Sequence, residues 1–323
     1  MLTYEKLRRK PQVAKSLIGM PVDEFDQFYA EFEAAHTERL WTSTTIRGKK
    51  KRQRVVGAGR KHKYDLRDRL LMTLFWLKAY TTYELLGFFY DLNKTNIEDN
   101  LNLILETLLR MTRFNFERPK AERHKLHSVA EVMDAFPDVR LVIDAKEQRI
   151  ERPKNKKDKD GNLQDRQKPY YSGKKKAHTI KNQAAISPTG RVEHASMSVP
   201  GGSIHDVTLL RQTDLLSKLD DEEAAMMDKG YDGIAADYPD KKLYLPFKAR
   251  RNQPLTDEQK AYNRFLAKYR IVVEHTIAQL NKFQILAQRF RHQLSKHSAI
   301  FRIVCGLVNR RIQLHPLKQY APA

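Results

Sequence analysis

Apolar residues in the first third of the chain recur with the period of α-helices. Residues 22–36 repeat aromatic side chains at helical spacing, and the same period predicts helices at 65–80, 81–89 and 95–109. The helix at 81–89 opens on a capping-box pattern that runs from Thr81 to Glu84. Three helices of this length, with a tight turn between the last two, are typical of a helix-turn-helix DNA-binding unit and equally of a plain helical bundle.

At residue 138 the pattern changes to short apolar runs of strand type. Five strands are expected, at 138–146, 176–186, 191–199, 223–228 and 243–247, with helices at 205–219 and 256–286 and a last amphipathic helix around 300–308. Three strands, a helix, two strands and a helix follow one another in the order of a ribonuclease-H-like fold. In that fold the first three strands form a meander and the fourth lies parallel beside the first.

The expected fold class is therefore mixed, α+β and α/β, with an N-terminal helical, helix-turn-helix-like domain followed by a ribonuclease-H-like catalytic domain. The expected segments are an N-terminal helical segment at 1–46, a basic linker at 47–63, a helix-turn-helix-like DNA-binding domain at 64–115, a connector at 116–137, the catalytic domain at 138–314 and a tail at 315–323. The linker is recognised by its three glycines among basic residues.

Composition excludes several classes of protein. The single cysteine, Cys305, has no partner for an intramolecular disulfide and excludes a cysteine-rich zinc site. No apolar run approaches the ~18 residues that span a bilayer, and charged residues interrupt Met1–Met20 where a signal peptide would need an apolar stretch. We therefore expect a soluble protein in a reducing compartment, without a membrane partner.

The formal net charge is +21, and the basic residues are concentrated in three windows. Residues 47–63 hold nine basic and no acidic residues, residues 146–181 hold thirteen basic and five acidic ones, and eight basic residues but no acid follow Glu274. One basic run is usually a solvated loop. Three of them favour surfaces that bind a nucleic acid, because phosphates release their counterions on binding.

Several basic residues are candidate DNA contacts. In the windows these are Arg52 and Arg54 and the run Lys174, Lys175 and Lys176. The helix expected at 95–109 carries acidic residues that would repel phosphates, so recognition by the helical part is expected to rest on Arg67, Arg69 and the stretch 47–63.

Three carboxylates stand at positions suited to metal chemistry. Asp144 follows the apolar run Leu141–Ile143, and Asp228 follows the apolar run 224–227. If these runs are neighbouring parallel strands, both side chains emerge at the edge where open α/β sheets bind ligands. Taken alone, each aspartate also fits an ordinary strand end or turn.

The third carboxylate, Glu274, lies on a helix that would cross the same edge. Arg270 precedes it by four residues and Lys282 follows it by eight, so the three can share a broad helical face and contact phosphate there. Two Mg²⁺ ions about 4 Å apart can activate an attacking oxygen and stabilise a leaving oxygen in phosphodiester cleavage. Mg²⁺ prefers oxygen ligands, so three carboxylates are enough to bind two such ions, with Mn²⁺ as a substitute.

A fourth acid competes with Asp228 for a place in this site. Asp206 follows His205 at the start of the helix expected at 205–219. An aspartate there has an ordinary role in capping and in complementing the helix dipole. Asp228 is better placed beside Asp144, so Asp206 is an accessory candidate, as is Tyr231 in the sequence that follows Asp228.

At these residues the chain resembles the DDE transposases of bacterial insertion sequences, in the insertion-sequence-five branch related to eukaryotic PIF/Harbinger transposases. The matching segments, which span nearly the whole chain, are Leu66–Leu109, Val142–Pro153, Tyr170–Lys181, Gly201–Asp206, Asp228–Gly233 and Arg270–Lys282. In that family one aspartate follows an apolar strand, another stands in an Asp-x-Gly-Tyr motif, and a glutamate follows an arginine. Asp144, Asp228 and Glu274 match these positions, which the resemblance identifies as catalytic and metal-binding.

The resemblance implies metal-dependent cleavage of transposon ends and transfer of the 3′-hydroxyl into target DNA. The implied partners are double-stranded DNA, as terminal inverted repeats and as target, and a second copy of the chain in a homodimer. The implied location is the bacterial cytoplasm, at the nucleoid. The alternatives are a catalytically inactive or domesticated relative that binds DNA without cutting it, and an RNA-binding protein, although no RNA-recognition motif is apparent.

The sequence departs from the family pattern at two places. Ala267 stands three residues before Arg270, where the family has a tyrosine, and Tyr269 is instead adjacent to the arginine. Ala145 and Lys146 follow the first aspartate in place of the commoner Gly-Thr. Neither departure removes an implied metal ligand, but the second indicates an altered pocket or a copy that has lost activity.

Overall fold

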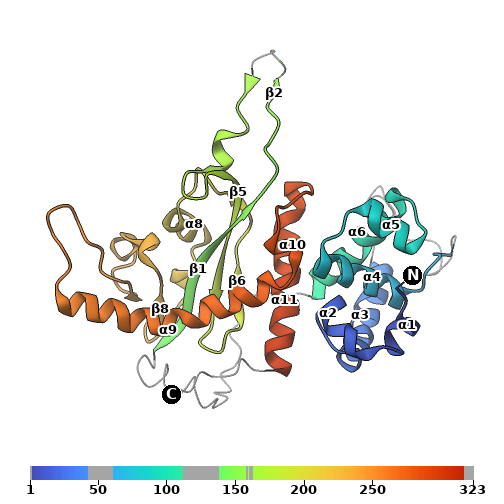
Figure 1. Ribbon diagram of the computed structural model, residues 1–323. Helices are drawn as coiled ribbons and strands as arrows, with labels where there is room; N and C mark the ends of the chain where they lie inside the picture. The colour runs from blue at the N-terminus through green and yellow to red at the C-terminus, as the bar shows by residue number, and fades with distance from the viewer. Residues whose placement is uncertain (1, 43–60, 112–137, 158, 160–162, 316–323) are drawn as a thin grey trace. The chain divides into compact units, whose positions relative to one another are not determined.

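The computed structural model describes residues 2–42, 61–111, 138–157, 159 and 163–315. The chain divides into two compact units (Figure 1), one made of Met1–Arg113 with Lys282–Ile285 and Arg302–Val304, the other of the remainder. The expected mixed class is confirmed, since the first unit is helical and the second contains a mixed sheet. Most of the predicted basic linker, with Arg52 and Arg54, the predicted connector and the tail from residue 316 lie outside the described residues.

Helices make up the first unit. In chain order they are α1 (Tyr4–Arg8), the 3-10 turn η1 (Pro11–Val13), α2 (Ala14–Ile18), α3 (Val22–Thr42), α4 (Leu66–Ala79), α5 (Tyr83–Tyr90) and α6 (Lys94–Met111). α4 is the central helix, because it packs against α2, α3 and α6 and buries Leu70, Leu74 and Trp76. Burial around its whole circumference accounts for its strongly apolar sequence.

Two helices of this unit begin at other residues than predicted. The side chain of Thr82 accepts the amide of Leu85 at 3.2 Å, so Thr82 caps α5 and the predicted start at Thr81 was wrong by one residue. The α6 helix begins before the predicted residue 95, because the Asn93 side chain accepts the amide of Asn96 at 2.8 Å. In both cases a polar residue within two positions of the predicted one accepts a free amide of the first turn.

The prediction that Arg69 reads DNA was wrong. Arg69 is only 4% exposed, and its Nε donates to the side chain of Asn100 in α6 at 2.6 Å. Arg67 lies over the aromatic rings of Tyr4 and Tyr29, at 4.6 and 4.4 Å from their centroids. Both guanidinium groups therefore stabilise contacts within the bundle.

The second unit contains the sheet and the later helices. Its strands are β1 (Val139–Arg149), β4 (Tyr171–Ser172), β5 (Ala177–Ile186), β6 (Val192–Ala195), β7 (Val199–Pro200), β8 (Ala224–Met226) and β9 (Lys242–Tyr244), with β2 (Lys156–Lys157) and β3 (Leu163–Gln164) as a separate pair. Its helices and 3-10 turns are η2 (Lys168–Tyr170), α8 (Asp206–Thr213), η3 (Leu216–Lys218), η4 (Lys229–Tyr231), η5 (Ile234–Ala236), α9 (Asp257–Asn281), α10 (Gln284–Ala287), η6 (Leu294–Lys296) and α11 (His297–Leu314). No described helix is long and apolar enough to cross a membrane.

Strand pairing follows the order β4-β5-β1-β8-β9, with β6 and β7 also paired to β5. β5 is antiparallel to β1, β6 is antiparallel to β5, and β8 and β9 run parallel to β1. The main strands β1, β5 and β6 thus form a meander, and β8 lies on the other side of β1. Inward side chains of β1 and β8, among them Ile143 and Ala225, pack with Leu210 of α8 in one buried cluster.

Several predicted strands and helices differ in the structure. The helix predicted at 205–219 ends at Thr213 and is followed by the 3-10 turn η3. β1 continues to Arg149 and pairs with β5 as far as Thr179, so the two strands form a ribbon that extends beyond β8 and β9 toward β2 (Figure 1). The single strand predicted at 191–199 is instead β6 and β7, which pair with different stretches of β5. The long helix predicted at 256–286 ends at Asn281 and is followed by the short α10.

A buried polar network joins α11 to the sheet. The Nε2 of His297 lies 2.9 Å from the side-chain oxygen of Gln148 in β1, and its Nδ1 lies 2.7 Å from the hydroxyl of Ser198. Asn182 of β5 donates to the same hydroxyl at 2.9 Å. Burial lowers the pKa of His297 to about 3, so the ring is neutral in the folded protein at ordinary pH.

This network predicts that the free energy of unfolding falls as the solution is acidified. The unfolded chain takes up a proton on His297 as pH falls through about 6.5, whereas the folded chain does so only near 3. The neutral ring therefore contributes stability above pH 6.5 that is lost toward pH 3, by roughly 2 kcal/mol between pH 7 and 5. Urea unfolding at these two pH values measures the loss.

Two variants provide the comparison for this experiment. His297→Gln removes the titrating ring, so its stability should depend less on pH than that of the unmodified protein. His205→Gln removes an exposed histidine and should keep the pH dependence of the unmodified protein. Equal slopes for all three proteins would show that His297 is not neutral inside the fold.

Candidate acidic site

The parallel pairing of β1 with β8 places Asp144 and Asp228 side by side. Val142 pairs with Met226, and each aspartate stands two residues further along its strand direction. Since side chains alternate along a strand, both aspartates point away from the buried cluster under α8. Asp228 lies two residues beyond the end of β8 and caps η4, accepting the amide of Gly230 at 2.8 Å.

The Asp144 carboxylate is held in a crowded negative environment. Burial, together with the charges of Asp228 and Asp206, raises its pKa to about 6 against the opposing effects of the Ala145 amide and of Arg270. The amide of Ala145 donates to Asp144 Oδ1 at 2.8 Å. A group whose charge is disfavoured by its neighbours in this way gains most from a bound cation.

The structure also brings Asp206 to this site. A Cβ atom on Gly230 would lie 2.9 Å from Asp228 Oδ1 and 3.0 Å from Asp206 Oδ2, so the two carboxylates flank that glycine. The other oxygen of Asp206 lies 2.8 Å from the Nζ of Lys181, an ion pair by distance without the angles of a hydrogen bond. Lys181 is buried and donates to the carbonyl of Ile204 at 2.8 Å. Asp206 therefore belongs to the acidic site in addition to starting α8.

Tyr231 lies beneath the acids. Its side chain is fully buried, and its hydroxyl accepts the side-chain amide of Gln183 at 3.0 Å. Burial raises the pKa of Tyr231 well above its usual value, and the charges of Asp206, Asp144 and Asp228 act in the same direction. The phenol therefore stays protonated and offers a neutral polar surface to the acids above it.

Glu274 does not form a metal-binding cluster with the two aspartates in the described part of the chain. It is exposed on α9. No three acidic, histidine or cysteine side chains of the described residues are arranged to hold a metal ion. Glu274 does share a helix face with Arg270, which precedes it by four residues.

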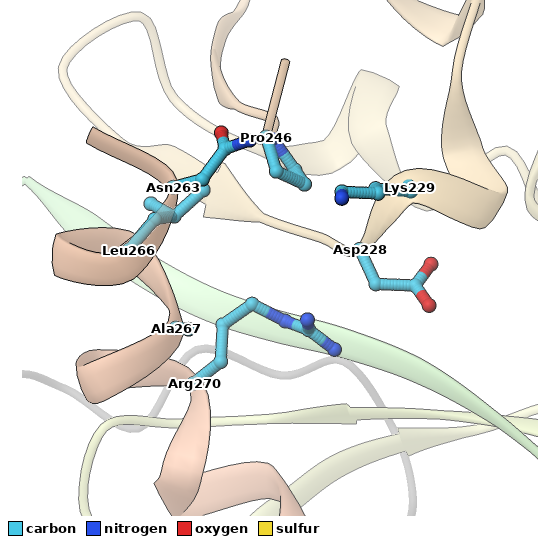
Figure 2. A pocket seen from close by; sticks show the side chains of 7 residues that line it. All are labelled: Asp228, Lys229, Pro246, Asn263, Leu266, Ala267 and Arg270. Carbon is cyan, nitrogen blue, oxygen red and sulfur yellow. The ribbon is translucent and has the colours of Figure 1, made fainter. Parts of the chain in front are cut away.

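That helix face lines a cavity of about 270 Å³ beside Asp228 (Figure 2). Its walls are formed by Asp228, Lys229, Pro246, Asn263, Leu266, Ala267 and Arg270. Figure 2 shows Arg270 reaching from α9 toward Asp228, and the Nε of Arg270 is buried without a hydrogen-bond partner. Lys229, Pro246 and Asn263 were not predicted from the sequence; the only signal was that Asn263 precedes Arg270 by two helical turns.

The remaining predicted DNA contacts are spread over the chain. Lys174, Lys175 and Lys176 are exposed in the turn between β4 and β5. Lys282 follows the last residue of α9, so the prediction that it continues the helix face of Glu274 was wrong. The Nζ of Lys146, two residues after Asp144, donates to the carbonyl of Leu286 at 2.7 Å, and burial lowers the pKa of Lys146 to about 8.

The part of the chain that carries these acids is similar to known proteins. The sequence profile of the DDE superfamily endonucleases matches residues 143–309, which contain Asp144, Asp228 and Glu274 and make up more than half of the chain. The chain is also similar to a probable transposase for insertion sequence element IS702 from Microchaete diplosiphon, with 29% identity over 257 residues, 79% of this chain and 84% of the relative. No solved structure matches. The chain belongs to the DDE superfamily endonuclease family.

Proposed function

We propose that this chain is the transposase of a bacterial insertion sequence, in the insertion-sequence-five branch, and that it cleaves transposon ends and transfers their 3′-hydroxyl into target DNA. The observation that carries the proposal is the pair Asp144 and Asp228 on adjacent parallel strands, with Arg270 beside them. The similarity to a probable transposase over most of both chains supports it. The strand order β6-β5-β1-β8-β9 supports a ribonuclease-H-like fold for the catalytic part.

The residues present fit a divalent cation. Asp144 and Asp228 offer only oxygen donors, which Mg²⁺ and Mn²⁺ prefer, and their mutual repulsion favours a cation between them. In the proposal these two aspartates hold two Mg²⁺ ions together with Glu274, which requires α9 or the Glu274 side chain to move toward them. When bound, such ions make an attacking oxygen more nucleophilic and neutralise charge on the phosphate.

Other side chains of the chain have separate tasks in this proposal. Arg270 and Lys229 bind the phosphate that enters beside Asp228, since both line the cavity there. Lys181 holds one oxygen of Asp206, which leaves the other directed at Gly230. Tyr231 remains protonated and keeps the floor of the site neutral. Asp206 and Tyr231 are thus accessory residues that position the acids.

The proposed partner is double-stranded DNA, as terminal repeats and as target. The exposed Lys174–Lys176 run and Lys282 bind its phosphates, as do Arg52 and Arg54 in the basic stretch, and helices α4 to α6 act as a helix-turn-helix unit. Two ends must be handled together, so the working form is a homodimer. The protein acts in the bacterial cytoplasm, at the nucleoid.

Replacing either aspartate tests the central assignment. Asp144→Asn and Asp228→Asn should each lower Mg²⁺- or Mn²⁺-dependent nicking by more than about 100-fold, because each removes a charged ligand. Binding to the same DNA, measured by gel shift, should stay unchanged. The substrate is a duplex that carries the inverted repeats bordering the gene.

Asp240→Asn is the matched control, since Asp240 is an exposed aspartate of the same unit. It should cleave like the unmodified protein. Undiminished nicking by both Asn variants would remove the two aspartates from the catalytic site. A protein that binds the repeats tightly and never nicks them in either metal would instead be the inactive, DNA-binding relative.

Glu274→Gln tests whether the exposed glutamate belongs to the same site. We expect nicking to fall about as far as for the aspartate variants, because the third carboxylate completes the metal site only when DNA and metal are present. Glu258→Gln, an exposed glutamate in the first turn of the same helix, should have little effect. Equal activity of the two glutamine variants would leave Asp144 and Asp228 with a different third ligand.

Gly230→Ala tests the spacing between the acids. The added methyl would lie within 3.0 Å of carboxylate oxygens of Asp228 and Asp206, so both must move. We expect nicking to fall by about 10- to 100-fold with an unchanged circular dichroism spectrum. Gly173→Ala is the control, because no atom lies within 4 Å of its added methyl. Full activity of Gly230→Ala would mean that the positions of these carboxylates do not matter.

A further inference from the structure

The lining of the cavity beside Asp228 is chemically mixed (Figure 2). The cationic groups of Lys229 and Arg270 line it together with the Asp228 carboxylate, and its apolar wall consists of Pro246 and of Leu266 and Ala267, which share α9 with Arg270. The buried Nε of Arg270 has no hydrogen-bond partner in the described part of the chain. A ligand that contacts both the cationic and the apolar residues carries an anionic group joined to an apolar surface.

The apolar wall is fixed in place by hydrogen bonds. The Asn263 side chain accepts the amide of Phe247 at 2.8 Å and donates to the carbonyl of the same residue at 2.9 Å. This reciprocal pair ties the segment that contains Pro246 to α9, and the Phe247 ring rests on Tyr262 of α9 with a centroid distance of 5.3 Å. Lys248 and Asp232 form a further ion pair at 3.5 Å. These contacts therefore hold α9 and the segment that contains Pro246 at a set separation.

Size limits the ligand to a small unit. About 270 Å³ lies just below the roughly 300–1,000 Å³ of pockets that enclose a whole drug-sized molecule. The cavity stays open because residue 267 is an alanine: a large side chain at this point of α9 would enter it. Phe247, which follows Pro246 in the chain, is 46% exposed.

We infer that this cavity receives one unstacked nucleotide of the DNA strand next to the phosphate that is cleaved. The base lies against Pro246, Leu266 and Ala267, and the adjoining phosphate is bound by Lys229 and Arg270. Enzymes that act on a nucleotide within a duplex extrude it into such a pocket, and stacking on the protein offsets the loss of pairing. This inference rests on the proposed function, because the neighbouring Asp228 is a metal ligand in that proposal.

The test combines a protein variant in which the cavity is filled with a DNA substrate in which one base is missing, and the two changes are made separately and together. Ala267→Trp fills the space, and Ala261→Trp adds the same side chain to an exposed position of α9 that does not line the cavity. Each protein is tested for Mg²⁺-dependent nicking of the terminal-repeat duplex. A set of duplexes, each with one abasic nucleotide near the cleaved bond, is tested in parallel. Circular dichroism and gel shifts check folding and overall DNA binding.

One abasic position should lower nicking by the unmodified protein by about tenfold, within the range expected for one base–protein stacking contact. Ala267→Trp should lower nicking of the intact duplex by a similar factor and cause no further loss on that abasic duplex. Ala261→Trp should behave like the unmodified protein. The inference would be overturned if the loss from Ala267→Trp and the loss from the abasic nucleotide multiplied at every position, or if Ala267→Trp nicked the intact duplex like the unmodified protein. Either result would leave the proposed cleavage activity standing. Absence of all metal-dependent nicking would instead overturn the proposed function.

Discussion

The parallel register between β1 and β8 is the constraint on which the site depends. Pairing Val142 with Met226 puts Asp144 and Asp228 in corresponding positions on one face of the sheet, because each follows its paired residue by two. The intervening side chains enter the buried cluster with α8 on the other face. A slip of one residue on either strand would exchange the acidic and apolar faces. The same packing that stabilises the core therefore fixes the two aspartates.

Placing acidic side chains close together costs free energy, and the acids of the site differ in how neighbouring groups offset that cost. The pKa of Asp144 is raised to about 6 by burial and by its acidic neighbours, whereas Arg270 acts in the opposite direction. Lys181 is buried but paired with Asp206, so the accessory acid is compensated within the protein. Asp144 and Asp228 have no such lysine among their described contacts. The pair without a lysine partner is the one that the family resemblance identifies as metal-binding, which is the distribution expected of a cation site.

Local pattern was enough to predict most elements and the adjacency of Asp144 and Asp228. The apolar runs before Asp144 and Asp228 identified two buried strands, and a general rule for parallel sheets placed their ends together. The pattern did not identify the N-cap of α5, because Thr81 and Thr82 are neighbouring residues that are equally suited to that position. It also gave no sign of the length of β1, because the part beyond Lys146 is polar and owes its extended form to pairing with β5.

Long-range contacts account for the other differences. Arg69 reads as a surface cation, yet it is buried because Asn100, on a helix distant in sequence, offers its amide oxygen. The proximity of Asp206 to Asp228 depends on Gly230, where the missing side chain lets two carboxylates approach the backbone. Such proximity cannot be derived from spacing along the chain, since it requires α8 and the end of β8 to meet.

Lys146 shows how a departure from a family pattern can be structural. Ala145 and Lys146 stand where the family commonly has Gly-Thr, and this departure indicated an altered pocket or lost activity. In the structure its Nζ binds the carbonyl of Leu286, and two residues further Gln148 donates to the carbonyl of Gln288 at 2.7 Å and contacts His297. Asp144, Lys146 and Gln148 thus lie at alternating positions of β1. Asp144 belongs to the acidic site, whereas Lys146 and Gln148 donate hydrogen bonds to the C-terminal segment. The lysine stabilises the packing of that segment on the sheet and leaves both aspartates in place.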